Sequence, residues 1–219
     1  MEQPLRFGVS VVTTDGRDVG SLYRVIVDTT SAVVTAITVR RRLLESGDLL
    51  KPGGWDRPRD LRVTIDAVTG ADEAETRVSL TEEEFLAQPP YTTTEGADPA
   101  TSQPAGVEAE GIATQVSAAL GGNYAAAHDE IENRTPAERH VGHDTRVWDR
   151  DPHTHVGDLD AVLMDDVNNR ITGLVVRQGV LFSHDVLVPG NYYADLEDDL
   201  IHIDIPSGDV HALPPYRGA

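Results

Sequence analysis

Apolar residues along this chain occur in short runs separated by polar breaks. Between residues 9 and 39 most of them are β-branched or aliphatic, and no run is long enough for an ordinary helix. Short runs rich in Val and Ile predict β-strands. Asp15-Gly16 is typical of a tight turn between the first two runs, and Asp28 begins a polar break of hairpin length. The pattern therefore predicts a mainly β protein.

The same pattern occurs twice. Residues 20–40 align with residues 157–177, and of these 21 positions 7 are identical while 4 exchange one aliphatic residue for another. Both copies end in Pro-Pro-Tyr, at residues 89–91 and 214–216. The offset falls from 137 to 125 because the first copy has 12 additional residues between Arg40 and Asp60. This spacing is too long for a solenoid repeat of roughly 20–50 residues, and it indicates a duplicated small domain.

We therefore divide the chain into a first copy (1–91), an acidic, partly helical linker (92–140) and a second copy (141–219). In each copy, strands too short to cover a core alone are expected to curl into a small barrel that hides their edges. The residues predicted to fill the two cores are Val25, Val27, Ile37, Val39, Val162, Met164, Leu174 and Val176.

Helical signals are few. Thr81 and Glu84 form the pattern of a capping box at a short helix, and Ser207 takes the equivalent N-cap position in the second copy. Residues 92–106 have a linker composition. Apolar spacing predicts a helix over residues 107–120, and a weaker pattern predicts another from Asn123 through Glu132.

These elements resemble the PRC-barrel family, a small SH3-like β-barrel. The residues that carry the resemblance are the Val-Gly entries at Gly20 and Gly157, the aliphatic strands ending in Asp28 and Asp165, and the strand 171–177. The segment 179–189 and the closing 213–216 continue it in the second copy. The resemblance implies two such barrels joined by a linker with short helices. It also implies a protein-binding or assembly module, and it carries no catalytic motif.

Composition narrows the function classes. The net charge of −19 disfavours binding to a phosphate backbone, so we expect no nucleic-acid partner. Cysteine is absent, which leaves no disulfide and no thiolate chemistry. No apolar window approaches a membrane span, and no secretion signal is recognisable at the start, so we expect a cytoplasmic protein without membrane insertion. We find no paired carboxylates or nucleophile motif that would predict an enzyme, and we predict no cofactor.

Histidines concentrate in the second half, where imidazole and carboxylate groups suit zinc or nickel. The alternative interpretation is solvated loop histidines, because the turn that holds two of them matches a polar turn of the first copy. The histidines considered are His140, His143, His153 and His155.

The additional residues of the first copy, near 43–59, form a basic cluster in an acidic chain. Arg and Trp are the side chains most enriched in interface hot spots. Three interpretations stay open: this loop docks on the acidic second copy or linker, it binds an external partner, or it is merely exposed. The predicted partner-binding residues are Arg41, Arg42, Trp55, Arg57 and Arg59.

The function we predict is a non-enzymatic protein-interaction or assembly module with a protein partner, and self-association stays open. One alternative is a small-molecule or metal-binding protein that uses the histidine-rich second half. Another, by family analogy alone, is a membrane-peripheral accessory of a photosynthetic or redox complex.

Overall fold

A computed structural model describes residues 2–41, 60–94, 130–150, 153–179, 184–205 and 213–218. The chain forms two compact units, one comprising Met1–Tyr91 with Asn133–Ala219 and the other Thr92–Glu132. In the smaller unit, strand β8 (Thr92–Thr94) pairs antiparallel with strand β9 (Glu130–Glu132). The helix predicted to run through Glu132 is therefore wrong at its end, because these residues extend to pair with β8. The helix predicted over 107–120 and the cap at Ser207 lie outside the described residues.

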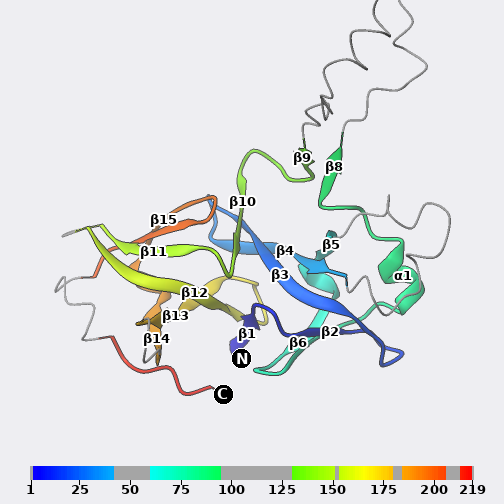
Figure 1. The fold of residues 1–219 in the computed structure, drawn as a ribbon, viewed down its shortest axis with the longest axis horizontal. Coiled ribbons are helices and arrows are strands. Elements are labelled where there is room, and N and C mark those ends of the chain that lie inside the picture. Colours follow the sequence, from blue (N-terminus) through cyan, green and yellow to red (C-terminus); the bar gives the residue numbers. More distant parts are fainter. Residues whose placement is uncertain are drawn as a thin grey trace, which may run out of the picture. The chain divides into compact units, whose positions relative to one another are not determined.

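The larger unit contains two sheets, one built mainly from each copy (Figure 1). The first has β2 (Ser10–Val12), β3 (Asp18–Asp28), β4 (Val33–Arg40), β5 (Asp60–Thr64), β6 (Val68–Ala71) and β7 (Glu75–Val78). The second has β11 (Arg146–Asp149), β12 (Thr154–Asp165), β13 (Ile171–Gln178), β14 (His184–Pro189), β15 (Tyr193–Glu197) and β16 (Leu200–Ile203). Short 3-10 turns at Ile65–Ala67 and Gly190–Tyr192 connect β5 to β6 and β14 to β15, and helix α1 (Glu82–Leu86) follows β7.

The two sheets have the same strand order. It reads β5-β4-β3-β2-β7-β6 in the first and β14-β13-β12-β11-β16-β15 in the second. In both, one neighbouring pair is parallel, β2 with β7 and β11 with β16. Gly20 and Gly157 are equivalent: a Cβ at either would collide with the backbone carbonyl of Arg40 or Arg177 respectively. The predicted equivalence of the two copies is thus confirmed at the level of strand order and at this close approach.

The copies exchange their first strands. Strand β1 (Glu2–Arg6) precedes β2 in sequence but pairs antiparallel with β12 of the second sheet. Strand β10 (Glu138–Gly142) precedes β11 but pairs antiparallel with β3 of the first sheet. The exchange is reciprocal, because Leu5 lies opposite Val162 just as Val141 lies opposite Val25. The segment 92–140 is therefore not only a linker, since β10 begins inside it and completes the first sheet.

The hairpin turns of the copies also meet reciprocally. The amide of Val34 donates to the carbonyl of Asn169 at 2.9 Å, and the amide of Ile171 donates to that of Ala32 at 3.0 Å. These are the same two positions in each copy, so the copies are related by a local pseudo-twofold arrangement. One hydrophobic cluster contains residues of both. We conclude that the sheets do not pack as independent modules.

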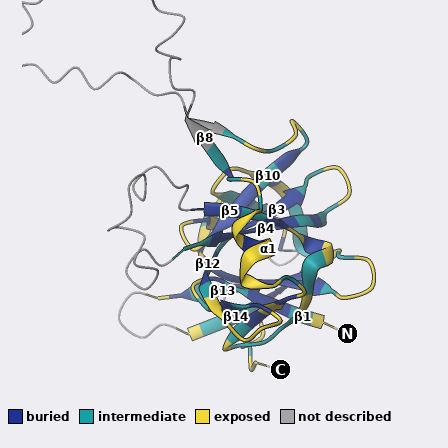
Figure 2. Ribbon diagram, turned by 90° about the vertical axis from the view of Figure 1, so that its right-hand side faces the viewer, coloured by how far each residue is buried: buried dark blue, intermediate teal, exposed yellow. Residues whose placement is uncertain are grey.

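The predicted core is confirmed. All eight residues named from the sequence are no more than 2% exposed, and Figure 2 shows buried strands beneath an exposed helix α1. The predicted capping box is present, with Thr81 accepting from the Glu84 amide. Asp28 and Asp165 cap their turns by accepting amide hydrogen bonds. Within the described ranges, no helix is long and apolar enough to cross a membrane.

Candidate binding face on the second sheet

Most of the partner-binding residues predicted in the first copy lie outside the described residues. This holds for Arg42, Trp55, Arg57 and Arg59. Arg41 is described, and it is partly exposed directly after β4. The interpretation of the basic insertion therefore stays a prediction.

The four histidines considered as ligands occupy three different environments. His143 is exposed in the turn after β10. His140 is only 5% exposed, so it is not the solvated loop residue that we expected. Its Nδ1 lies 2.9 Å from the hydroxyl of Tyr91, and its Nε2 lies 3.6 Å from a carboxylate oxygen of Asp199. The strand exchange buries this side chain, a consequence that local sequence does not reveal.

The remaining two histidines contact an indole. The ring of His153 stacks on Trp148 with centroids 4.8 Å apart and planes at 27°, and the ring of His155 lies 5.2 Å away, tilted by 53°. His155 belongs to β12, so the turn predicted to hold both histidines is shorter than expected. Among the described residues, no group of three or more His, Cys, Asp or Glu side chains is placed to hold a metal ion. The contacts of His153 and His155 are thus aromatic.

Trp148 lies in a row of side chains that crosses three strands. It is opposite His155 of β12 and opposite His202 of β16. The neighbouring row places Arg146 opposite Leu200. Since successive side chains of a strand point to opposite faces, Val147 between them enters the core while both rows point outward. We call Arg146, Trp148, His155, Leu200 and His202 the Trp148 face.

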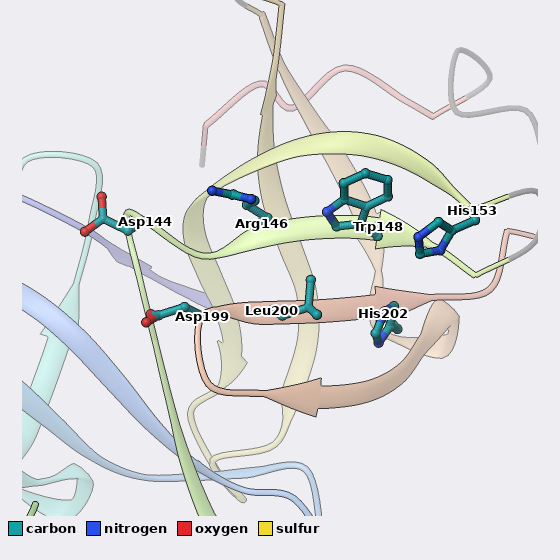
Figure 3. A pocket seen from close by; sticks show the side chains of 7 residues that line it. All are labelled: Asp144, Arg146, Trp148, His153, Asp199, Leu200 and His202. Atoms are coloured by element: carbon teal, nitrogen blue, oxygen red, sulfur yellow. The ribbon is translucent and has the colours of Figure 1, made fainter.

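A pocket of about 530 Å³ lies on this face (Figure 3). Figure 3 shows Trp148 and Arg146 rising from β11 beside Leu200 and His202 of β16, with His153 at one end and two carboxylates at the other. This volume is within the range of roughly 300–1,000 Å³ found for ligand pockets. The lining residues are Asp144, Arg146, Trp148, His153, Asp199, Leu200 and His202.

The equivalent face of the first copy has different chemistry. By register, Trp148 is matched by Val12, Arg146 by Ser10 and His202 by Arg77. The first-copy groups are paired locally: Ser10 donates to Asp18 at 2.9 Å, and Arg77 donates to Glu75 at 2.7 Å. By contrast, the exposed guanidinium of Arg146 forms no ion pair within the described part of the chain. The two copies share a scaffold, and the second alone presents an indole and imidazoles at these positions.

Other charged groups are used to join the copies. Glu138 of β10 receives hydrogen bonds from Arg62 and Thr35 of the first copy. Burial alone would raise the pKa of Glu138, but these bonds and one from the Thr135 amide outweigh burial and lower the pKa to about 2. On the other side, Arg6 of β1 pairs with Asp160 at 2.7 Å and with Asp185 at 3.0 Å. These charged groups are paired with one another, which indicates a structural role in joining the copies.

The geometry defines a β protein of two interlocked sheets, with an outward aromatic face and a pocket on the second. Residues 144–210 match the family model of the PRC-barrel domain, so the chain contains a PRC-barrel domain that carries this face. A search of curated proteins found no match to the chain.

Proposed function

We propose that this protein is a non-enzymatic interaction or assembly module that binds a protein partner through the Trp148 face. The observation that supports this most is the difference between the copies. On equivalent strands of the same fold, Val12 and Ser10 of one copy correspond to Trp148 and Arg146 of the other. We also interpret the first copy as a diverged PRC-barrel domain, because its sheet has the same strand order.

The chemistry of the face favours a protein. Trp and Arg are the residue types that contribute most to binding energy at protein interfaces, and here they stand side by side on a sheet. The strong negative charge of the chain disfavours a nucleic acid. A cytoplasmic location belongs to the same proposal.

A second candidate uses the same pocket for a small anionic aromatic molecule. The guanidinium of Arg146, which forms no ion pair with the described residues, can bind a carboxylate or phosphate. The indole of Trp148 offers a surface for stacking. Native mass spectrometry of the purified chain, with and without a substitution of Trp148, distinguishes a bound small molecule from a protein partner.

The main test is a quantitative pull-down with immobilised full-length chain carrying Trp148→Ala. The repeat supplies a matched control, Val12→Ala, at the equivalent position of the first copy. A partner of the face should be captured about 10-fold less or worse by Trp148→Ala and normally by Val12→Ala. If both variants capture the same proteins as the native chain, in the same amounts, the proposal is wrong. Circular dichroism of each variant establishes that its fold is intact.

A further inference from the structure

Each copy closes with a Pro-Pro-Tyr segment that lies along the outer strand of its own sheet. We call Pro89–Tyr91 the first latch and Leu213–Gly218 the second latch. In the first, Arg62 donates its amide to Pro89 and the Tyr91 amide donates to Asp60, both at 2.9 Å. In the second, Leu187 donates its amide to Pro214 and the Tyr216 amide donates to Asp185, both at 2.8 Å. The central prolines form antiparallel bridges, Pro90 with Leu61 and Pro215 with Val186. The same peptide motif is thus bound twice in the same way.

The motif suits this edge for a physical reason. Only its first and third residues form backbone hydrogen bonds with the outer strand. The middle position needs no amide hydrogen, so proline costs nothing there. Proline also restricts the segment to an extended conformation before it binds, which lowers the entropy lost on binding.

Two side chains of the second latch, those of Leu213 and Tyr216, contact apolar surface. Leu213 is 8% exposed and belongs to the main hydrophobic cluster. Tyr216 packs with Leu187 against a small cluster on the outer face of the sheet, formed by Ala161, Leu163 and Val175. The edge therefore fits a peptide in which an apolar residue is followed by Pro-Pro-Tyr, and it holds this peptide by two hydrogen bonds and two apolar contacts.

The two latches differ in how firmly they are held. Tyr91 is fully buried, its hydroxyl lies 2.9 Å from His140, and its carbonyl accepts from the Asn133 amide. Tyr216 is partly exposed, and both neighbouring prolines are exposed. Its hydroxyl donates to Glu73 at 2.6 Å. Segments with few buried contacts open at a fraction of the free energy of global unfolding. The second latch is therefore the one that can leave its edge.

We propose that the edge of β14 is a peptide-binding site for Pro-Pro-Tyr segments, and that the second latch of another copy of this chain occupies it in trans. Exchange of an identical element conserves every contact, which makes it a low-cost route to association. The proposal concerns a different surface from the Trp148 face, and neither depends on the other.

Cysteine trapping tests the exchange, because the chain contains no cysteine of its own. Val186 and Pro215 face each other as a non-hydrogen-bonded pair, for which Cα atoms are about 4.5 Å apart and a disulfide can form. One chain carries Val186→Cys and the other Pro215→Cys, and the mixture is oxidised. An interchain disulfide whose yield rises with protein concentration is expected. Salt should raise the yield further, because it screens the repulsion between two chains of charge −19.

The first latch supplies the matched control. Chains with Leu61→Cys and Pro90→Cys, at the equivalent bridge, should give no interchain disulfide. The double variant Val186→Cys/Pro215→Cys should form its disulfide within one chain, which shows that the two cysteines can pair. If it does so while the mixed single variants never cross-link, exchange between copies is refuted.

A labelled peptide of sequence Leu-Pro-Pro-Tyr-Arg-Gly-Ala tests the site itself. Fluorescence anisotropy should show binding to full-length chain carrying Tyr216→Ala, and roughly 10-fold weaker binding when the peptide tyrosine is replaced by alanine. N-methylation of the peptide tyrosine amide should weaken binding too, because it removes the bond to Asp185. Equal affinity for all three peptides, or no binding, would overturn the assignment of the edge as a Pro-Pro-Tyr site.

Discussion

Because the copies exchange their first strands, a substitution in β1 should loosen the second sheet and not the first, to which β1 is closer in sequence. Leu5 belongs to the first copy, yet it is fully buried opposite Val162 on the edge of the second sheet. Replacing a buried Leu with Ala costs about 2–5 kcal/mol through lost apolar contacts and the remaining cavity. Since 1.4 kcal/mol corresponds to a factor of ten, the equilibrium constant for local opening of that edge should rise about 30-fold or more. The amide exchange rate there should rise by the same factor. The strand affected should be β12, although β2 and β3 follow Leu5 in sequence.

Hydrogen exchange of the full-length chain measures this directly. Leu5→Ala should raise exchange at residues 161–165, and the reciprocal Val141→Ala should raise it at residues 24–28 of the first sheet, by a smaller amount because Val is smaller than Leu. Denaturant unfolding gives the loss in total stability. If Leu5→Ala loosens only the first sheet and leaves residues 161–165 protected, β1 does not complete the second sheet and the exchange is refuted.

Two further predictions concern the junction and the repeat. The folded-state pKa of Glu138, about 2, is below its usual 4.5, so its stabilising effect is present above about pH 4.5 and is lost as pH falls towards 2. Glu138→Gln should lower the free energy of unfolding by on the order of 3 kcal/mol at neutral pH, because Arg62 loses its partner. It should also flatten the dependence of stability on pH between these values. An unchanged pH dependence in acid unfolding experiments would contradict this. Gly157→Ala forces a Cβ against the Arg177 carbonyl and should cost about 1–3 kcal/mol in thermal unfolding, and a neutral effect would show that the backbones do not approach closely.

The parts of the fold that sequence predicts are those encoded locally. Alternation of apolar residues identifies strands and core positions such as Val25 and Val162. The turn at Asp28 is also local, because its carboxylate accepts hydrogen bonds from the amides of Thr30 and Ser31. The strand exchange is not encoded in this way. Because β3 and β12 are equivalent strands of equivalent sheets, β1 is compatible with either, and the sequence contains no signal that distinguishes its own copy from the other.

The candidate face was missed for a different reason. We singled out Trp55 because basic residues surround it, whereas Trp148 lies in an ordinary strand pattern. The available signal was the comparison of the two copies, which places Trp148 at the position of Val12. Folding alone does not explain why an outward position holds a Trp in one copy when a Val is sufficient at the same position of the other. Aligning the copies residue by residue would have found it.

The pocket and the junction between the copies share one turn. Asp199 lines the pocket, and a carboxylate oxygen of the same residue lies 3.6 Å from Nε2 of His140 on the exchanged strand β10. The adjacent Asp198 is held by Arg134 through two hydrogen bonds and accepts the His140 amide. At the same end of the pocket, Asp144 follows β10 by two residues. One end of the pocket is therefore positioned by contacts that exist only because the strands are exchanged. A binding face needs side chains held in place before the partner arrives, and the exchange supplies that rigidity to the second sheet.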